Sequence, residues 1–136
     1  MTQRDKELLI KDLCARLPYG VKGLYYSTVM SLHMVDPFDN YHPLYCVTKS
    51  GSEYIGIDEF KPYLFPLSSI TEEQEKELSK LGVSYGEYAL HDDIRGLGIM
   101  VDEAYIFFEF CYKHHIDFLG LIEMGLAEDA TDKNIY

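Results

Sequence analysis

The residue types best suited to metal chemistry gather at His114, His115 and Asp117. The pair His115-x-Asp117 has the spacing of the histidine and carboxylate in a two-histidine, one-carboxylate iron site. That site needs a further histidine downstream, and no histidine follows His115. A helix C-terminus favours histidines through its dipole, and an aspartate that follows can cap the next helix. We therefore interpret these three residues as structural.

A second set of chemistry-bearing residues is divided between two parts of the chain. The segment His91 to Asp93 could meet His33 or His42 in a hydrolytic metal site, but charged clusters between periodic segments are usually solvated turns. The GLG sequence at positions 96–98 lacks the third glycine of a dinucleotide loop. The sequence thus indicates no catalytic, metal or cofactor residue. A small hydrolase or nucleotide-handling enzyme, with a site in the β half or near His91 to Asp93, stays an alternative.

Tyrosine is the most unusual aromatic feature, since the chain has twelve tyrosines and no tryptophan. Tyr25, Tyr26, Tyr41, Tyr45 and Tyr54 fall in one stretch that is also rich in β-branched residues. Each ring combines apolar area with a polar tip, which suits a partner-binding face. The ordinary β-propensity of tyrosine is the competing explanation.

The charge is strongly acidic and unevenly spread. Twelve basic and 23 acidic residues give a formal charge of −11; residues 1–22 carry +2 and the remainder −13. Such a surface repels phosphate backbones, so we do not expect nucleic-acid binding unless the +2 segment provides it. It attracts basic protein surfaces, although an acidic charge can also serve solubility alone. The predicted interaction surface combines three tyrosines with an acidic helix start: Tyr25, Tyr45, Tyr54, Glu72, Glu73, Glu75 and Glu77.

The first element expected to position these residues is a helix over residues 3–17. Leucine recurs every fourth residue on one side, and Pro18 ends the helix. Two pairs of opposite charge are expected to face solvent on the other side: Glu7 with Lys11, and Asp12 with Arg16.

From Val21 to Ile57 the chain reads as short strands separated by turns. The strand Thr28 to Val35 alternates, which predicts Met30, Leu32 and Met34 on the core side. A hairpin follows, in which Leu44 to Thr48 and Glu53 to Ile57 flank a turn at Gly51. We expect a small antiparallel sheet or an SH3-like barrel, covered by the first helix.

Residues 61–70 are predicted to be a hinge. Pro62 and Pro66 cannot donate a backbone hydrogen bond, so no regular element is expected to run through them. Thr71 and Gln74 then form a capping box that starts a helix over residues 72–81, anchored by Leu78 and Leu81.

Residues 71–126 are expected to be a helical half. A helix from Asp102 to about His115 is apolar almost all round, which indicates either a central core element or a subunit interface through Tyr105 to Tyr112. Phe107, Phe108, Phe110 and Cys111 are expected in or near the core. A last short helix, Phe118 to Met124, would follow, and residues 127–136 would be a polar tail in which only Ile135 and Tyr136 dock.

The whole chain of 136 residues has the size of a single α+β domain: residues 1–60 are the helix plus β half, followed by the hinge, the helical half and the tail. No apolar run approaches the roughly 18 residues of a membrane span, and the charged N-terminus does not resemble a signal peptide, so a cytoplasmic protein is expected. Cys14, Cys46 and Cys111 are isolated among apolar neighbours and are expected to be reduced core thiols.

Three segments together carry a family resemblance: KDLCARLPYGVK at 11–22, KPYLFPLSSITEEQ at 61–74 and HHIDFLGLIEMGLAEDAT at 114–131. They resemble a large group of uncharacterised small proteins encoded by gut bacteria and their phages, which share these segments around a variable middle. The resemblance implies a bacterial or phage protein and no particular activity. A constant frame with a variable β middle suits a family whose members bind different targets. Our leading hypothesis is a non-enzymatic protein-interaction module, such as a phage-derived acidic modulator of a host protein.

Overall fold

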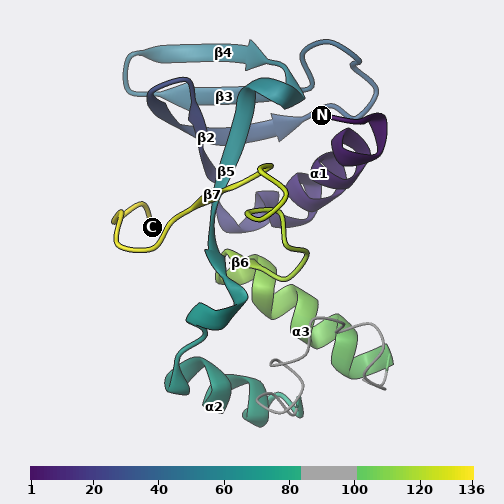
Figure 1. The fold of residues 1–136 in the computed structure, drawn as a ribbon, viewed down its shortest axis with the longest axis vertical. Helices are drawn as coiled ribbons and strands as arrows, with labels where there is room; N and C mark the ends of the chain where they lie inside the picture. Colours follow the sequence, from purple (N-terminus) through teal and green to yellow (C-terminus); the bar gives the residue numbers. More distant parts are fainter. Residues whose placement is uncertain (84–100) are drawn as a thin grey trace.

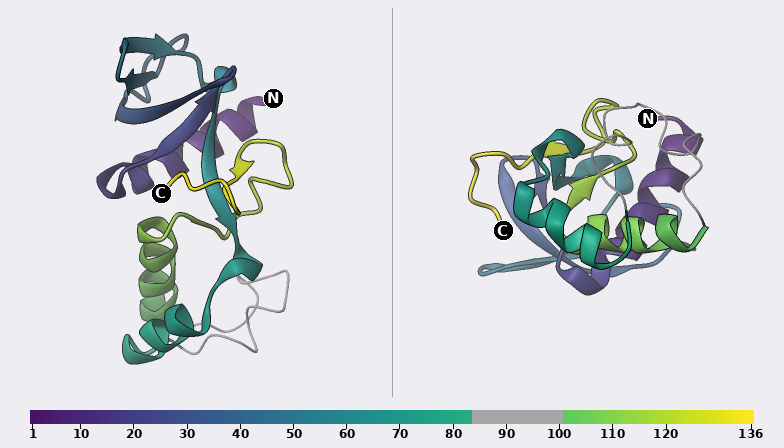
Figure 2. Two further views of the ribbon diagram at one scale, coloured as in Figure 1. Left: turned by 90° about the vertical axis from the view of Figure 1, so that its left-hand side faces the viewer. Right: turned by 90° about the horizontal axis from the view of Figure 1, so that it is seen from below.

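The structure is a computed structural model that describes residues 1–83 and 101–136. The described part forms a sheet with one helix beside it at one end and two helices at the other (Figure 1; Figure 2). The helices are α1 (Gln3–Arg16), α2 (Glu72–Lys80) and α3 (Val101–Lys113), and the strands are β1 (Lys22–Tyr25), β2 (Thr28–Val35), β3 (Leu44–Thr48), β4 (Gly51–Ile55), β5 (Phe60–Pro66), β6 (Ile116–Asp117) and β7 (Glu128–Asp129). The α+β class is confirmed.

The sheet is mixed rather than antiparallel. Its strand order is β4-β3-β2-β1-β5-β6, and β7 also pairs with β5. The ladders from β4 to β5 are antiparallel as expected, but β6 and β7 join β5 in parallel. The prediction failed for these two strands because each has only two residues, which is too short for a periodic signal.

Two cores are built on this frame, and we name the two parts after them. The sheet unit comprises α1, β1–β5 and residues 121–127, with a core that includes Leu9, Leu13, Leu32, Leu44 and Leu64. The helical unit comprises α2, α3 and β6, with a smaller core of Leu78, Val83, Phe107, Phe110, Cys111 and Ile116. Phe108 packs against this second core, so all four residues predicted in or near a core from α3 are confirmed.

Helix α1 forms over nearly the predicted range, with one correction to its exposed side. Thr2 and Asp5 make a reciprocal capping box at its start. Asp12 and Arg16 do not face solvent: their ion pair measures 2.7 Å between Asp12 Oδ2 and Arg16 Nε, and both side chains are completely buried. The spacing of four residues predicts that two side chains of a helix meet. It does not predict whether the rest of the chain covers that side of the helix.

Strand β2 departs from regular alternation near its end. Met30 and Leu32 are buried as predicted, but Met34 is 46% exposed. The pairing with β3 slips at this point, since Leu32 faces Cys46 and Met34 faces Tyr45. This β-bulge at His33 turns Met34 to the outer face, where it joins the tyrosines.

The predicted hinge is wrong, because β5 runs from Phe60 to Pro66 without interruption. The strand tolerates its prolines because of where they fall. Pairing with β1 ends at Pro62, pairing with β7 begins at Tyr63, and Pro66 is the last residue. The buried Phe60 ring of β5 lies against Gly23 of the neighbouring β1, and a Cβ at Gly23 would clash with it.

The C-terminal half is not the expected set of helices. Residues 118–125 form turns instead of a helix, and the Asp117 carboxylate accepts hydrogen bonds from the backbone amides of Leu121 and Ile122 at 2.9 Å each. The expected tail is also more ordered, since Ala130 N–H donates to Leu64 O at 2.8 Å beside β7. The docking of Tyr136 is confirmed: its hydroxyl donates to Tyr63 O at 2.9 Å, and its ring stacks on His115 at 3.5 Å.

Helix α2 begins at the predicted capping box, in which Thr71 and Gln74 exchange hydrogen bonds. Only one of its two expected anchors is buried, because Leu78 is fully covered and Leu81 is 49% exposed.

Among the cysteines, Cys46 and Cys111 are buried as expected and Cys14 is exposed. None of the helices in residues 1–83 and 101–136 combines the length and apolar content needed to span a membrane.

Candidate functional site

Exposed apolar side chains gather at the end of the sheet where β2, β3 and β4 meet the β2–β3 loop. Met34, Tyr45 and Tyr54 form one row across three strands, since Met34 pairs with Tyr45 and Tyr45 with Tyr54. The two tyrosine rings lie 4.8 Å apart. Their neighbour Cys46 is buried, so the row faces outward. Together with Phe38 and Tyr41 of the adjoining loop, we call these residues the aromatic end.

The loop between β2 and β3 holds its two aromatic residues in a fixed frame. Asp36 N–H donates to Pro43 O at 2.7 Å and closes the loop. The Asp36 side chain accepts from Phe38 N–H, and the Asp39 side chain accepts from Tyr41 N–H. Within this frame Phe38 is 91% exposed and Tyr41 81% exposed, the two highest values among large apolar side chains in the described residues. Aromatic area is therefore presented to solvent by a backbone that is already ordered.

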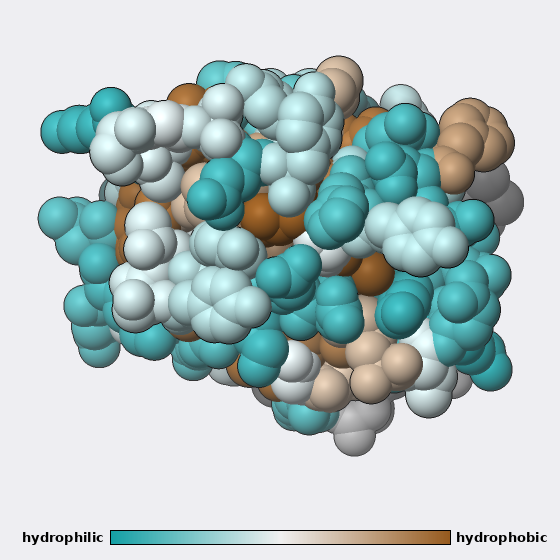
Figure 3. Space-filling view, turned by 90° about the horizontal axis from the view of Figure 1, so that it is seen from above, coloured by the Kyte–Doolittle hydropathy of each residue, from teal (hydrophilic) through white to brown (hydrophobic). Residues whose placement is uncertain are grey.

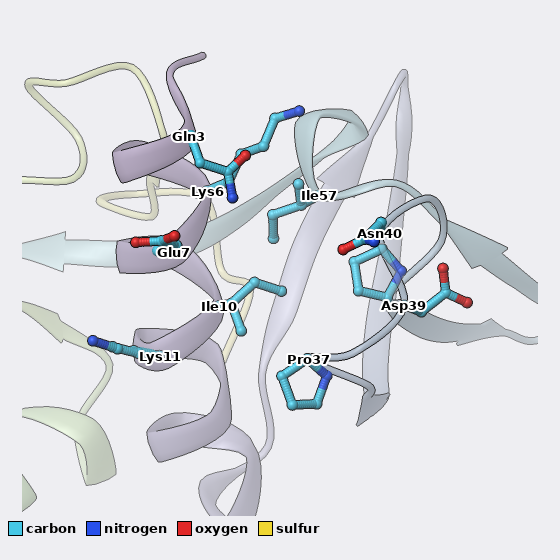
Figure 4. Close-up of a pocket in the computed structure, with 10 residues that line it drawn as sticks. Gln3, Lys6, Glu7, Ile10, Lys11, Pro37, Asp39, Asn40 and Ile57 are labelled. Atoms are coloured by element: carbon cyan, nitrogen blue, oxygen red, sulfur yellow. The ribbon is translucent and has the colours of Figure 1, made fainter.

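The same loop forms one wall of a groove against α1 (Figure 4). The groove has a volume of about 370 Å³, within the range of small-ligand pockets. Ile10 of α1, Ile57 and Pro37 point into it, while polar side chains of α1 and of the loop stand along its two rims. The surface seen from this end alternates hydrophobic patches with hydrophilic side chains (Figure 3). A partner would meet protruding rings beside a hollow that can receive one of its own apolar side chains.

Tyr25, the third tyrosine of the predicted surface, lies on the opposite face of the sheet. It pairs with Phe60 and packs against the core of the sheet unit. Loss of hydration raises the pKa of the Tyr25 hydroxyl, and the nearby carboxylates of Glu53 on β4 and of Glu59 raise that pKa further. Strands β1 and β4 are separated by two strands in the sheet order, so this proximity shows that the sheet curls strongly.

The acidic residues of the predicted surface lie at the other end of the molecule. Glu72, Glu73 and Glu75 are in the first turn of α2, which belongs to the helical unit (Figure 1). Glu77 is not free, because its carboxylate lies 3.7 Å from Lys113 Nζ and 3.2 Å from His114 Nε2. The seven residues predicted as one interaction surface therefore occupy three separate places.

The histidines at the end of α3 border a second hollow of about 500 Å³, between α3, α2 and the C-terminal residues. Burial lowers the pKa of His115 to about 4, with Arg16 as the next cause, so this ring is neutral at pH 7. His114 packs against Phe110 at 4.4 Å, and both oxygens of Asp117 are engaged by backbone amides. No group of three metal-binding side chains converges anywhere in residues 1–83 and 101–136. The prediction at His91 to Asp93 lies outside the described residues.

Burial also makes two of the thiols unreactive. It raises the pKa of Cys46 to about 12 and raises the pKa of Cys111, the latter against the effect of the nearby Arg16. Thiolates are the nucleophilic form, so neither buried cysteine is suited to covalent chemistry.

Phe38 was missing from the sequence-based surface, although the sequence carries a signal for it. The loop reads DPFDNYHP, in which aspartates able to form Asx turns and two prolines surround a phenylalanine. An aromatic residue inside a stretch of turn formers has no strand to join, so it is exposed.

A scan of the chain against protein-family models and searches for similar curated proteins and similar solved structures returned no match.

Proposed function

We propose that this protein is a non-enzymatic interaction module that binds a basic protein partner through the aromatic end. The observation that carries the proposal is the exposure of Phe38 and Tyr41 on a loop that its own hydrogen bonds hold in place. Aromatic residues are enriched among the side chains that dominate binding energy. A preordered loop loses little conformational freedom on binding, which leaves more of that energy as affinity.

The charge around the aromatic end supports a partner of positive charge. Residues 36–60 carry five acidic side chains and one basic side chain, a net charge of −4. Complementary charge speeds encounter and selects among partners more than it adds affinity. The resemblance to small proteins of gut bacteria and phages extends the proposal to a modulator of a bacterial host protein in the cytoplasm.

The acidic start of α2 is a second candidate surface. Glu72 and Glu73 are exposed, and no lysine or arginine of the described residues pairs with them. A basic partner could bind there instead of at the aromatic end. Because the two surfaces lie at opposite ends of the molecule, one experiment distinguishes them (Figure 1).

The test is site-specific photo-crosslinking in bacterial lysate. A photoreactive amino acid replaces Phe38, Tyr54 or the exposed Lys76 of α2, one position at a time. We expect one and the same protein to be captured from positions 38 and 54 and not from 76, with a yield that falls as salt is raised. Capture from position 76 alone would place the interface on α2, and no capture from 38 and 54 would overturn the proposal.

A competition experiment provides the matched control. Unlabelled wild-type protein should suppress the adduct, whereas the double variant Phe38→Ser/Tyr54→Ser should not. Tyr105→Ser removes a tyrosine of similar exposure from α3 in the helical unit, so this variant should compete as well as the wild type. Loss of competition by Tyr105→Ser would instead direct attention to the segment Tyr105 to Tyr112.

A further inference from the structure

We propose that Tyr25, Tyr26, Glu53 and Glu59 form a binding site for the guanidinium group of an arginine side chain. The site lies on the inner, curled face of the sheet and is distinct from the aromatic end. The inference rests on the proposed function in that the arginine would belong to the protein partner. Its own test uses a peptide and no partner.

The two tyrosine rings pack edge to face and form a corner, and the exposed ring of Tyr26 offers a face on which a flat cation can stack. Tyr25 and Tyr26 have ring centroids 4.6 Å apart and planes inclined by 64°. Tyr26 stands in the connection between β1 and β2 with φ of 52°, a backbone region that favours glycine, and its side chain is 75% exposed. The chain thus keeps a large ring at a turn position where a glycine would fit more easily.

Two carboxylates lie beside this corner. Their negative charge is not neutralised by any lysine or arginine of the described residues. Glu59 is held in place by two hydrogen bonds, since Oε1 accepts from Gly56 N–H at 3.0 Å and Oε2 accepts from the Tyr26 hydroxyl at 3.3 Å. Glu53 of β4 lies near enough to the Tyr25 hydroxyl for its carboxylate to raise the pKa of that hydroxyl.

Arginine fits this combination better than any other side chain. Its guanidinium is planar, stacks on aromatic faces and offers donors in a fork that matches carboxylate oxygens. It is also more weakly hydrated than an ammonium group, so it is more easily transferred to a partly apolar corner. The tyrosine faces supply the stacking surface and the two glutamates supply the acceptors.

The test is an NMR titration of the whole protein with the peptide Gly-Ser-Arg-Ser-Gly at low salt. We expect saturable shifts at Tyr25 and Tyr26, with a Kd of about 1–10 mM because a single side chain supplies the binding energy. The same peptide with citrulline in place of arginine keeps the shape without the charge and should cause no saturable shift. Absence of saturation up to about 20 mM, or equal shifts from citrulline, overturns the proposal.

Three variants make the result specific to this site. Glu53→Gln/Glu59→Gln removes two charges, while the amide oxygen introduced at position 59 keeps an acceptor for Gly56 N–H, and should weaken binding at least about fivefold. Tyr26→Gly removes one wall at a position whose φ suits glycine, and should abolish saturation. Glu72→Gln/Glu73→Gln makes the same charge change on α2 and should leave Kd unaltered. An equal loss in this control would mean general charge attraction and would overturn the site, while the crosslinking result would stand independently.

Discussion

The sheet unit and the helical unit bury their apolar residues by different means. The core of the sheet unit is closed by five strands and α1, and its residues come from both ends of the described chain, from Leu9 to Ala127. The core of the helical unit depends on a few side chains of α2 and α3 around Leu78. The difference indicates a rigid platform, which carries the aromatic end, joined to a smaller and less stable part.

One buried arginine connects the two units. Arg16 is fixed to Asp12 within α1, and it also donates to Cys111 O at 3.3 Å and to Ile116 O at 2.8 Å in the helical unit. Its guanidinium lies 5.3 Å from the Tyr112 ring centroid. The side chain thus satisfies backbone carbonyls of α3 and β6 from a helix of the other unit.

The largest expected effect is the loss of this connection. Arg16→Met leaves the buried Asp12 carboxylate without its cation and two carbonyls without a donor, so we expect the free energy of unfolding to fall by about 3–5 kcal/mol. The double variant Asp12→Leu/Arg16→Met should recover much of that loss, because no buried charge is left unpaired. Urea denaturation followed by circular dichroism measures both. A loss below about 1 kcal/mol for the single variant would show that Arg16 does not hold the units together.

Matched cavity variants compare the two cores directly. Leu44 in the sheet unit and Leu78 in the helical unit are both fully buried, so each Leu→Ala change removes the same atoms. We expect a cost of about 3–5 kcal/mol for Leu44→Ala and about 2–3 kcal/mol for Leu78→Ala. Hydrogen exchange should show faster exchange throughout the protein for Leu44→Ala, and chiefly in α2 and α3 for Leu78→Ala. Equal acceleration in both units by both variants would mean one cooperative unit.

The pH dependence of stability should report the burial of His115. The pKa of His115 is lowered to about 4 in the folded protein, against about 6.5 for an unfolded histidine. The unfolded state therefore binds more protons between these values, so stability should fall as pH decreases from about 6.5 toward about 4. His115→Asn, a residue tolerated at the φ of 59°, removes this titration. The measurement is the slope of unfolding free energy against pH, which should be shallower for the variant; an unchanged slope would contradict the assignment.

Local signals in the sequence predicted the parts of the fold that depend on neighbours along the chain. The capping box of Thr71 and Gln74, the hairpin of β3 and β4, and the burial of the leucine side of α1 all follow from spacing within a few residues. These features are confirmed because capping and amphipathicity act within one or two turns of a helix.

The errors share the opposite cause, since each depends on a segment distant in sequence. Strand β5 accepts Pro62 because the pairing with β1 ends at this residue and the pairing with β7 begins at the next one. Met34 turns outward because the register between β2 and β3 shifts at a bulge. Asp12 is buried because α3 covers it from far along the chain, as the bond from Arg16 to Cys111 shows. For the candidate site, the sequence indicated Tyr45 and Tyr54 as binding residues but could not separate their face from that of Tyr25.

The smallest expected effect on stability belongs to the residue on which the proposed function depends most. Phe38 is 91% exposed, so replacing it by serine removes almost no buried area, and the free energy of unfolding should change by less than about 0.5 kcal/mol. Capture of the partner should nevertheless be lost, because an exposed aromatic side chain can supply much of the binding energy while it adds almost nothing to the stability of the free protein. Urea denaturation and the crosslinking competition on the same sample separate the two quantities. A stability loss above about 1 kcal/mol would mean that Phe38 supports the loop itself, and its exposure would then no longer argue for a partner.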